Sequence, residues 1–283
     1  MKIVSGSASK KIAEELAKLL NYKQIPIKTK RFVDGELYLC LQESVNNEDI
    51  VVVQTTYPDE NIIELLLLLD AVSRGKAATI TVVIPYFGYA RQDKQFKAGE
   101  PVSADALAKL ISVNADMVIT VDPHKEHILS FFSVPAASVS AAPDIAEYFK
   151  DKDIDMVLAP DKGAFSRAQI VAGSLGCDMD YLEKKRIDDK TITIKTKRLD
   201  VVQKSILIVD DIISTGTTMA VAIQELKNQK ASTVSVACTH GLFAGDAVSK
   251  LIKAGCNELI ATDTIITPLS KISIASALAE AIR

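Results

Sequence analysis

The sequence contains no tryptophan, only 5% of its 283 residues are aromatic, and none of its four cysteines forms a Cys-x-x-Cys pair. A zinc ribbon and a thioredoxin-type redox motif are therefore excluded. Positive charge is not in excess, with 33 Lys and Arg against 36 Asp and Glu, which argues against a nucleic-acid partner. The longest hydrophobic run, residues 62–72, contains two acids and falls short of the ~20 apolar residues of a membrane span. We expect a soluble, cytoplasmic protein with neither nucleic-acid nor membrane partners.

Short runs of β-branched residues alternate with amphipathic helical patterns along the chain. The runs are largely apolar, which is typical of strands buried on both faces of a parallel sheet. They lie at residues 50–53, 79–84, 117–121, 156–158, 206–209, 233–237 and 259–261. The alternation predicts an α/β fold with mainly parallel sheets flanked by helices.

Two pairs of segments within the chain are similar in sequence. Residues 80–88 resemble residues 154–163, and residues 118–122 resemble residues 207–210. The second copy is longer between these matches, by a stretch that contains a charged hairpin starting near Glu183. We therefore predict two similar domains, residues 1–141 and 142–283, with an insertion in the second and a last helix that could pack on either domain. Residues 36–42 alternate in hydrophobicity and predict an antiparallel strand.

The most specific segment begins with a buried strand that ends in two adjacent acids, Asp210 and Asp211. A loop rich in hydroxyl groups follows, and then a helix begins. Its residues that could contact a phosphate are Ser214, Thr215, Gly216, Thr217 and Thr218. Loop amides and a helix N-terminus favour an anion, and two carboxylates can accept hydrogen bonds from a diol. An Asx turn with an ordinary helix cap is the structural alternative.

This segment resembles the phosphoribosyl diphosphate binding loop of the type I phosphoribosyltransferase fold. On that resemblance alone, the chain could make or consume phosphoribosyl diphosphate. Further segments resemble, in the same order, those of the ribose-phosphate pyrophosphokinase (PRPP synthetase) family. They are residues 31–36, 85–94, 121–124 with 131–132, 158–163 and 239–243. The resemblance covers residues from about 5 to 265 and implies two type I phosphoribosyltransferase-like domains.

The resemblance implies that the first domain binds ATP. An aromatic ring such as Phe32 can stack on adenine, and an Arg91 guanidinium matches phosphate oxygens with two parallel hydrogen bonds. Without the resemblance, the Phe32 segment would be interpreted as a tight turn, and Arg91 could form a surface ion pair. The implied ATP-binding residues are Phe32, Asp34, Gly35, Glu36, Arg91 and Gln92. The family places the Phe32 turn in the site of a neighbouring subunit, which implies a homo-oligomer, at least a dimer.

Two further pairs of residues take their roles from the resemblance. His124 and Asp161 follow strands, at the edge where α/β sheets place ligands, and the family uses both around the Mg²⁺ of Mg-ATP. Because Mg²⁺ prefers oxygen ligands, His124 is expected to act through water or phosphate. Lys184 and Arg186 match the family's mobile catalytic loop, whose closure adds positive charge and excludes water. Adjacent cations on an exposed arm are also typical of a simply solvated surface.

The implied reaction transfers the diphosphoryl group of ATP to the anomeric hydroxyl of ribose 5-phosphate. The acids would hold the ribose diol, the loop and Arg186 would bind ribose 5-phosphate, and Lys184 would stabilise developing charge. A phosphoribosyltransferase would share the loop but needs no ATP turn, and a catalytically silent regulatory relative would lose the cationic arm. A P-loop kinase is excluded because the chain has no Gly-x-x-x-x-Gly-Lys-Ser/Thr string.

Overall fold

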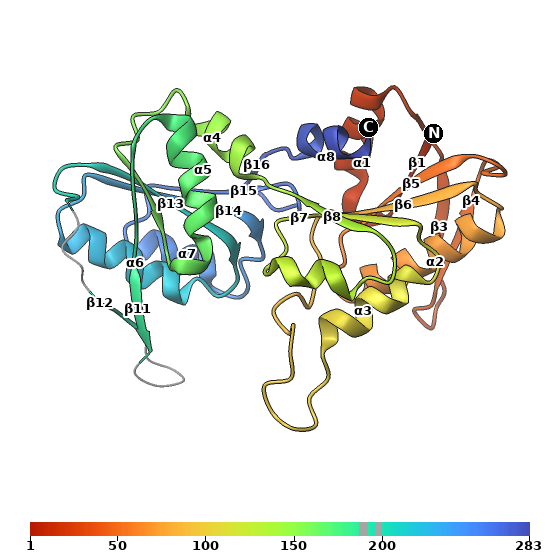
Figure 1. Ribbon diagram of the computed structural model, residues 1–283, viewed down its shortest axis with the longest axis horizontal. Helices are drawn as coiled ribbons and strands as arrows, with labels where there is room; N and C mark the ends of the chain where they lie inside the picture. Colours follow the sequence, from red (N-terminus) through yellow and green to blue (C-terminus); the bar gives the residue numbers. More distant parts are fainter. Residues whose placement is uncertain (187–191, 196–199) are drawn as a thin grey trace. The chain divides into compact units, whose positions relative to one another are not determined.

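The computed structural model describes residues 1–186, 192–195 and 200–283, with side chains described outside 183–199 (Figure 1). The chain divides into two compact units. Unit 1 contains Met1–Val139, Thr264–Ile266 and Ser273–Arg283, and unit 2 contains Ser140–Asp263 and Thr267–Ile272. Within the described residues, no helix has the length and hydropathy that a membrane span requires.

Unit 1 is built on a six-stranded sheet in the order β2-β1-β5-β6-β7-β8, with every neighbouring pair parallel. Its strands are β1 (Lys2–Ser5), β2 (Lys23–Gln24), β5 (Asp49–Val53), β6 (Thr79–Ile84), β7 (Met117–Val121) and β8 (Ala136–Val139). A separate antiparallel hairpin joins β3 (Ile27–Arg31) to β4 (Leu37–Leu41), as the alternation of residues 36–42 predicts. The helices are α1 (Lys10–Leu20), α2 (Glu60–Arg74), α3 (Ser103–Ser112) and α8 (Ala275–Ile282).

The last helix completes unit 1 although it comes from the far end of the chain. Helix α8 packs on α1, and the Ser273 hydroxyl donates a hydrogen bond to the Glu15 carboxylate of α1. A second link is the Thr55 hydroxyl, which donates to the Thr264 carbonyl over 2.7 Å. The position of the last helix, which the sequence left open, is therefore in unit 1.

Unit 2 has its own six-stranded sheet in the order β10-β9-β13-β14-β15-β16, again parallel throughout. Its strands are β9 (Met156–Ala159), β10 (Asp178–Tyr181), β13 (Ser205–Ile213), β14 (Thr233–Gly241), β15 (Glu258–Thr262) and β16 (Ser270–Ile272). An antiparallel hairpin joins β11 (Glu183–Arg186) to β12 (Ile192–Lys195). The helices are α4 (Ala142–Phe149), α5 (Phe165–Leu175), α6 (Thr217–Asn228) and α7 (Ala247–Lys253). Short 3-10 turns lie at Ser7–Ser9 and Glu126–Phe131 in unit 1 and at Lys162–Ala164 in unit 2.

The two sheets have the same strand order, so the duplication and the parallel α/β class are confirmed. The internal sequence similarity nevertheless paired strands that are not equivalent. It aligned β6 with β9 and β7 with β13, whereas the strand order makes β6 equivalent to β14 and β7 equivalent to β15. Buried parallel strands resemble one another because each is a β-branched run followed by polar residues. The predicted insertion is also wrong, because both units carry a hairpin after their second strand.

Burial of both faces of the sheet explains why these strands read as continuous hydrophobic runs. In β13, Ile206 and Ile208 pack into one cluster of buried side chains, while Leu207 and Val209 pack into another. All four side chains are inaccessible to solvent. Because successive side chains of a strand alternate between faces, both clusters depend on the same four-residue run.

Candidate functional site

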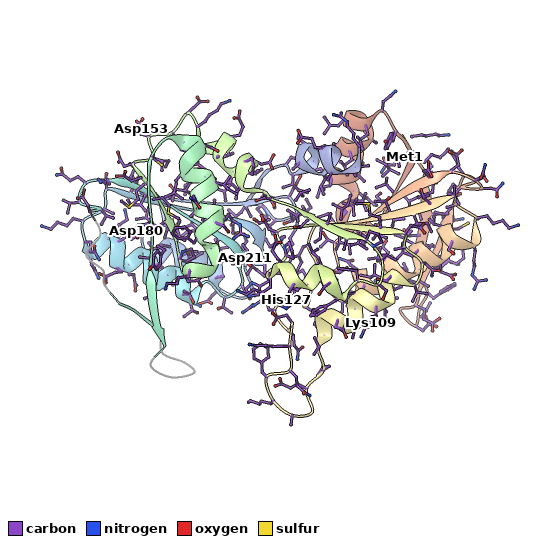
Figure 2. All side chains as sticks on the ribbon, viewed as in Figure 1. Met1, Lys109, His127, Asp153, Asp180 and Asp211 are labelled. Carbon is purple, nitrogen blue, oxygen red and sulfur yellow. The ribbon has the colours of Figure 1, made fainter. Side chains whose placement is uncertain are left out.

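The two acids of unit 2 lie inside strand β13 rather than beyond its end. The strand continues past Asp210 and Asp211 to Ile213, four residues further than the predicted run. Pairing with β9 stops at Ile208, whereas pairing with β14 continues to Gly241. Both acids are thus held by one neighbouring strand and lie past the paired part of the other. Each is partly buried, and the Asp211 amide donates to Asp210 Oδ1 over 2.9 Å (Asp211 is labelled in Figure 2).

The loop after β13 turns sharply into α6 at Gly216. Its φ is +69°, in the left-handed region that favours glycine, and a Cβ there would lie 3.3 Å from Leu251 Cγ. No side chain caps α6 at this position. The first amides of a helix have no intrahelical acceptor, so the N-terminus of α6 is suited to an anion. Thr215 and Thr217 are exposed, and Ser214 and Thr218 are partly buried.

The pKa of a buried cysteine on β14 is affected by the charged groups at this edge of the sheet. Cys238 lies opposite Asp210 in the strand register. Burial raises the pKa of the Cys238 thiol well above its usual value, and the negative charges of Asp210 and Asp211 raise it further. The positive charge of Arg167, on α5, opposes this rise. Arg167 therefore belongs to the same charged region, although its sequence context, an ordinary amphipathic helix, gives no sign of it.

Asp161 follows β9, the neighbour of β13, so acids from two adjacent strands lie at the same edge of the unit 2 sheet. Its Oδ1 accepts a hydrogen bond from the Gly163 amide over 2.8 Å, which fixes the side chain at the start of a 3-10 turn. Among the described residues, no group of three His, Cys, Asp or Glu side chains could by itself hold a metal ion. Partly buried carboxylates of this kind fit Mg²⁺, which protein sites bind through one or two carboxylates together with substrate phosphates.

The two predicted catalytic cations lie on the hairpin of unit 2. Lys184 and Arg186 belong to β11, where they stand opposite Ile194 and Ile192 of β12. The antiparallel arm expected near Glu183 is therefore present. Residues 187–191 and 196–199 lie outside the described residues.

The predicted adenine-binding turn connects β3 to β4 in unit 1. The Phe32 amide donates to the Glu36 carbonyl, and the Gly35 amide donates to the Phe32 carbonyl, both over 2.9 Å. Gly35 has a φ of +92°, and Asp34 Oδ1 accepts from the Glu36 amide over 3.1 Å. The Lys30 ammonium lies 4.4 Å from the centroid of the Phe32 ring, which is 46% exposed. The backbone of the turn is thus held by its own hydrogen bonds, while the side chains of residues 32–36 are exposed.

Arg91 and Gln92 follow β6 through a close-packed turn. Gly88 has no room for a side chain, because a Cβ there would lie 2.7 Å from the Thr56 carbonyl oxygen. The Gln92 amide donates to the Tyr89 carbonyl over 2.8 Å, and its side-chain oxygen accepts from Ser103 at the start of α3. Arg91 is exposed. In the described part of the chain, no hydrogen bond or ring contact joins these residues to the Phe32 turn.

His124 lies three residues after β7, at the carboxyl edge of the unit 1 sheet, and is exposed. The nearby His127, to which the sequence assigns no role, lies with its Nε2 3.2 Å from the Asp93 carboxylate (His127 is labelled in Figure 2). The ring of His127 also contacts Phe131 edge-on. His124 belongs to unit 1 and Asp161 to unit 2, and each of these two predicted magnesium contacts follows a strand of its own sheet.

Comparisons with known proteins agree with this architecture. Residues 1–114 match the N-terminal domain of ribose phosphate pyrophosphokinase, and residues 136–267 match the phosphoribosyl transferase domain. The ribose-phosphate pyrophosphokinase of Methanosarcina mazei is 43% identical over 284 residues, which cover 100% of this chain and 95% of the relative. That of Methanothermobacter thermautotrophicus is 41% identical, with 99% of both chains covered. The crystal structure of phosphoribosylpyrophosphate synthetase from Mycobacterium smegmatis matches with a TM-score of 0.86 and 31% identity, over 100% of this chain and 97% of that one.

A duplicated parallel α/β fold with a phosphoribosyl transferase domain in its second half defines a phosphoribosyltransferase-like protein. Within that class, the chain belongs to the ribose-phosphate pyrophosphokinase family, because it matches members of that family over its whole length. The family membership predicted from the sequence motifs is therefore confirmed.

Proposed function

We propose that the chain transfers the diphosphoryl group of Mg-ATP to the anomeric hydroxyl of ribose 5-phosphate, giving 5-phosphoribosyl 1-diphosphate and AMP for nucleotide biosynthesis. Such an enzyme is a ribose-phosphate diphosphokinase, and its phosphorylated substrates agree with a place in the cytoplasm. The observation that carries this proposal is the carboxyl edge of unit 2, where two partly buried acids precede an open hydroxyl loop and a helix N-terminus. A phosphoribosyltransferase is less well supported, because residues 1–114 match the N-terminal domain of the pyrophosphokinases.

The ribose 5-phosphate site is assigned to unit 2. Asp210 and Asp211 would accept hydrogen bonds from the ribose 2- and 3-hydroxyls, and loop amides would donate to the 5-phosphate. The residues proposed for the loop contacts are Ser214, Thr215, Gly216, Thr217 and Thr218, with Arg186 assisting on phosphate. The exposure of Thr215 and Thr217 supports this assignment, because a ligand can reach both hydroxyl groups.

The ATP site is assigned to residues of unit 1. The exposed ring of Phe32 would stack on adenine beside Asp34, Gly35 and Glu36, while Arg91 and Gln92 would contact the phosphates. As the resemblance to the family implies, the turn is proposed to serve the site of a neighbouring copy. The protein would then be a homo-oligomer of at least two subunits.

The chemical step is an in-line substitution at the β-phosphorus of ATP. A bond forms between this phosphorus and the anomeric oxygen, the bond to the α,β-bridging oxygen breaks, AMP leaves, and the hydroxyl proton passes to solvent. Mg²⁺, when bound, neutralises phosphate charge. Asp161 would hold it directly, and His124 would act through water or phosphate. Lys184 and Arg186 would stabilise the charge that develops on the bridging and transferred oxygens.

The experiment is phosphorus NMR of the protein with ATP, ribose 5-phosphate and Mg²⁺. The proposal predicts AMP in step with a diphosphate ester on ribose. Intact ATP would instead indicate a silent relative. Consumption of added phosphoribosyl diphosphate and a nucleobase, giving a nucleotide and pyrophosphate, would indicate a transferase. A Lys184→Ala enzyme with full turnover would remove the role given to that lysine.

A further inference from the structure

A lysine of helix α7 is bonded to the loop that follows β13. The Nζ atom of Lys250 donates to the Thr215 carbonyl over 3.0 Å and lies 3.4 Å from Thr217 Oγ1. It also lies 3.3 Å from an oxygen of the carboxylate of Asp246, the residue that precedes α7. An ammonium group carries three N–H donors, and two of them are given to the loop. Lys250 is therefore held by the protein through two hydrogen bonds to the loop and one ion pair.

The first of these bonds sets the direction of a neighbouring amide. Because a peptide unit is planar and trans, the Thr215 carbonyl and the Gly216 N–H point in opposite directions. The carbonyl accepts from α7, so the Gly216 N–H points away from α7. Gly216 also packs closely on this helix, since a Cβ there would lie 3.3 Å from Leu251 Cγ. Two adjacent residues of α7, Lys250 and Leu251, thus fix both the orientation and the distance of this peptide.

The second bond acts on a hydroxyl group at the start of α6. When Thr217 Oγ1 accepts from Lys250, its own proton is left to be donated to another group. Thr215 Oγ1 lies 3.4 Å away and is one such acceptor within the protein. Thr217 is exposed at the first position of α6, so an anion could take that proton in its place. The lysine therefore favours the hydroxyl rotamer that an anionic ligand requires.

We propose that Lys250 is a positioning residue that holds the 214–217 loop in the shape that binds the 5-phosphate of ribose 5-phosphate. It acts through the Gly216 amide and the Thr217 hydroxyl without touching the substrate. This inference rests on the proposed function, since it deepens the role of the same loop. It predicts a selective effect: the affinity for ribose 5-phosphate depends on Lys250, and the affinity for ATP does not.

The experiment measures the dissociation constant of ribose 5-phosphate by calorimetry and the two Michaelis constants by turnover. The variant is Lys250→Met, which keeps the length and apolar stem of the side chain and removes its donors. The matched control is Lys253→Met, an exposed lysine of the same helix without a bond to the loop. Losing the two loop bonds should weaken ribose 5-phosphate binding about tenfold. The KM for ATP should stay within about twofold, and Lys253→Met should resemble the wild type.

Two further variants separate positioning from a loss of structure. Lys250→Arg can donate to both loop acceptors and should recover part of the lost affinity for ribose 5-phosphate. A merely structural defect would instead change the binding of both substrates. If Lys250→Met fails to fold, Lys250→Leu, which likewise has no donor, takes its place under the same criteria. A dissociation constant within twofold of the wild type, or an equal weakening of both substrates, would overturn the inference.

Measurements on the wild-type protein distinguish a failure of the proposed function from a failure of the role given to Lys250. If it binds ribose 5-phosphate without forming AMP, the proposed function fails, while the dissociation constants of the variants still decide the role of Lys250. If it does not bind ribose 5-phosphate, both proposals fall. If it turns over and only Lys250→Met loses affinity for ribose 5-phosphate, both stand.

Discussion

The loop after β5 in unit 1 and the loop after β13 in unit 2 occupy the same place in the same strand order, but their polar side chains are used differently. In unit 1, Gln54, Thr55 and Thr56 follow the strand and are at most 2% exposed. The Gln54 carboxamide donates to Glu64 over 2.8 Å and accepts from the Ala8 amide over 3.2 Å. The hydroxyls of both threonines are also bonded to the protein backbone.

In unit 2, the corresponding loop leaves its hydroxyl groups accessible. Thr215 and Thr217 are exposed, and the helix that follows has no side-chain cap. The same strand order thus carries two loops whose polar groups have different uses. Where the polar groups after the third strand of the sheet are bonded within the protein, they stabilise the unit, and where they are accessible, they can bind a ligand. The predictions below test this division, from the largest expected effect to the smallest.

Asp211→Asn should have the largest effect, and on activity alone. The amide keeps the shape of the side chain but loses the charge that would hold the ribose hydroxyls. Charge-assisted hydrogen bonds of this kind are worth about 1.5–3 kcal/mol each, so kcat/KM for ribose 5-phosphate should fall about 100-fold or more. Steady-state kinetics and a thermal melt on the same sample check this. A variant with a lowered melting temperature and unchanged kinetics would show that Asp211 belongs to the fold instead.

Glu64→Ala should have the opposite profile. Glu64 is 5% exposed, and its carboxylate accepts hydrogen bonds from the Ser7 amide, the Ser7 hydroxyl and the Gln54 carboxamide. Truncation leaves these donors without their acceptor, which should cost about 2–4 kcal/mol of stability. Calorimetric melting measures the loss, with exposed Glu14→Ala of the same unit as the control. A large rise in the KM for ribose 5-phosphate with unchanged melting would break the comparison.

The same contrast explains how far the sequence could predict this protein. The acids and hydroxyls of the 210–218 segment are contiguous in the chain, so their pattern alone indicates a phosphate site. The contacts of Glu64 with Ser7, and of Lys250 with Thr215, join residues far apart in the sequence. They depend on how helices pack, and no local pattern marks either residue. Hydrophobic runs predict the central strands, whereas the two-residue strand β2 is too short to show a pattern of its own.

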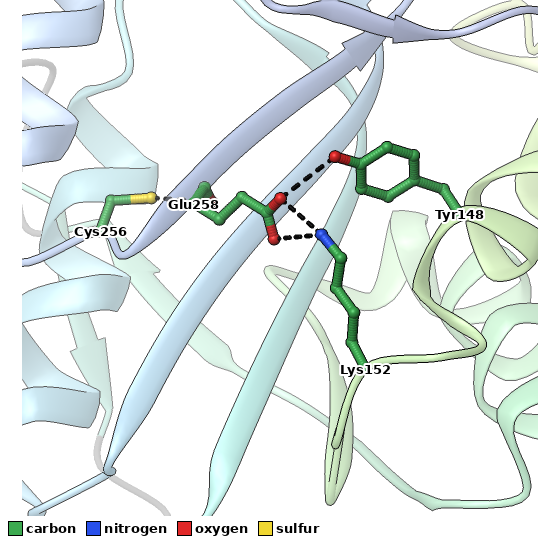
Figure 3. Close-up of polar contacts among 4 residues, drawn as sticks. All are labelled: Tyr148, Lys152, Cys256 and Glu258. Carbon is green, nitrogen blue, oxygen red and sulfur yellow. Dashed lines mark hydrogen bonds and ion pairs between the residues drawn. The ribbon is translucent and has the colours of Figure 1, made fainter.

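The opposite, amino-terminal edge of unit 2 should behave like the bonded loop of unit 1. Lys152 Nζ lies 2.5 and 2.7 Å from the two oxygens of Glu258, at the start of β15, and the Tyr148 hydroxyl donates to the same carboxylate over 3.2 Å (Figure 3). About a third of each charged side chain is exposed. Glu258→Gln should therefore cost only about 1 kcal/mol and leave both Michaelis constants unchanged.

The dependence of stability on salt distinguishes the charge interaction of Lys152 with Glu258 from apolar packing. The difference in melting temperature between wild type and Glu258→Gln should shrink at ~1 M salt, because ions screen exposed charge pairs. A difference that does not depend on salt would show that packing around Tyr148, rather than charge, stabilises this edge.

The smallest effect is expected next to this ion pair, at Cys256, whose Sγ lies 3.2 Å from the Glu258 carbonyl oxygen. Burial raises the pKa of this thiol to about 11. The folded protein thus holds a proton that the unfolded chain releases near pH ~8.5, so its contribution to stability is complete below that pH and is lost as the pH rises toward 11. Cys256→Ala should leave turnover and melting nearly unchanged at pH 7 and should flatten the decline of stability above pH ~9. Rapid alkylation of Cys256 in the native wild type at pH ~8 would contradict this, because only the thiolate reacts.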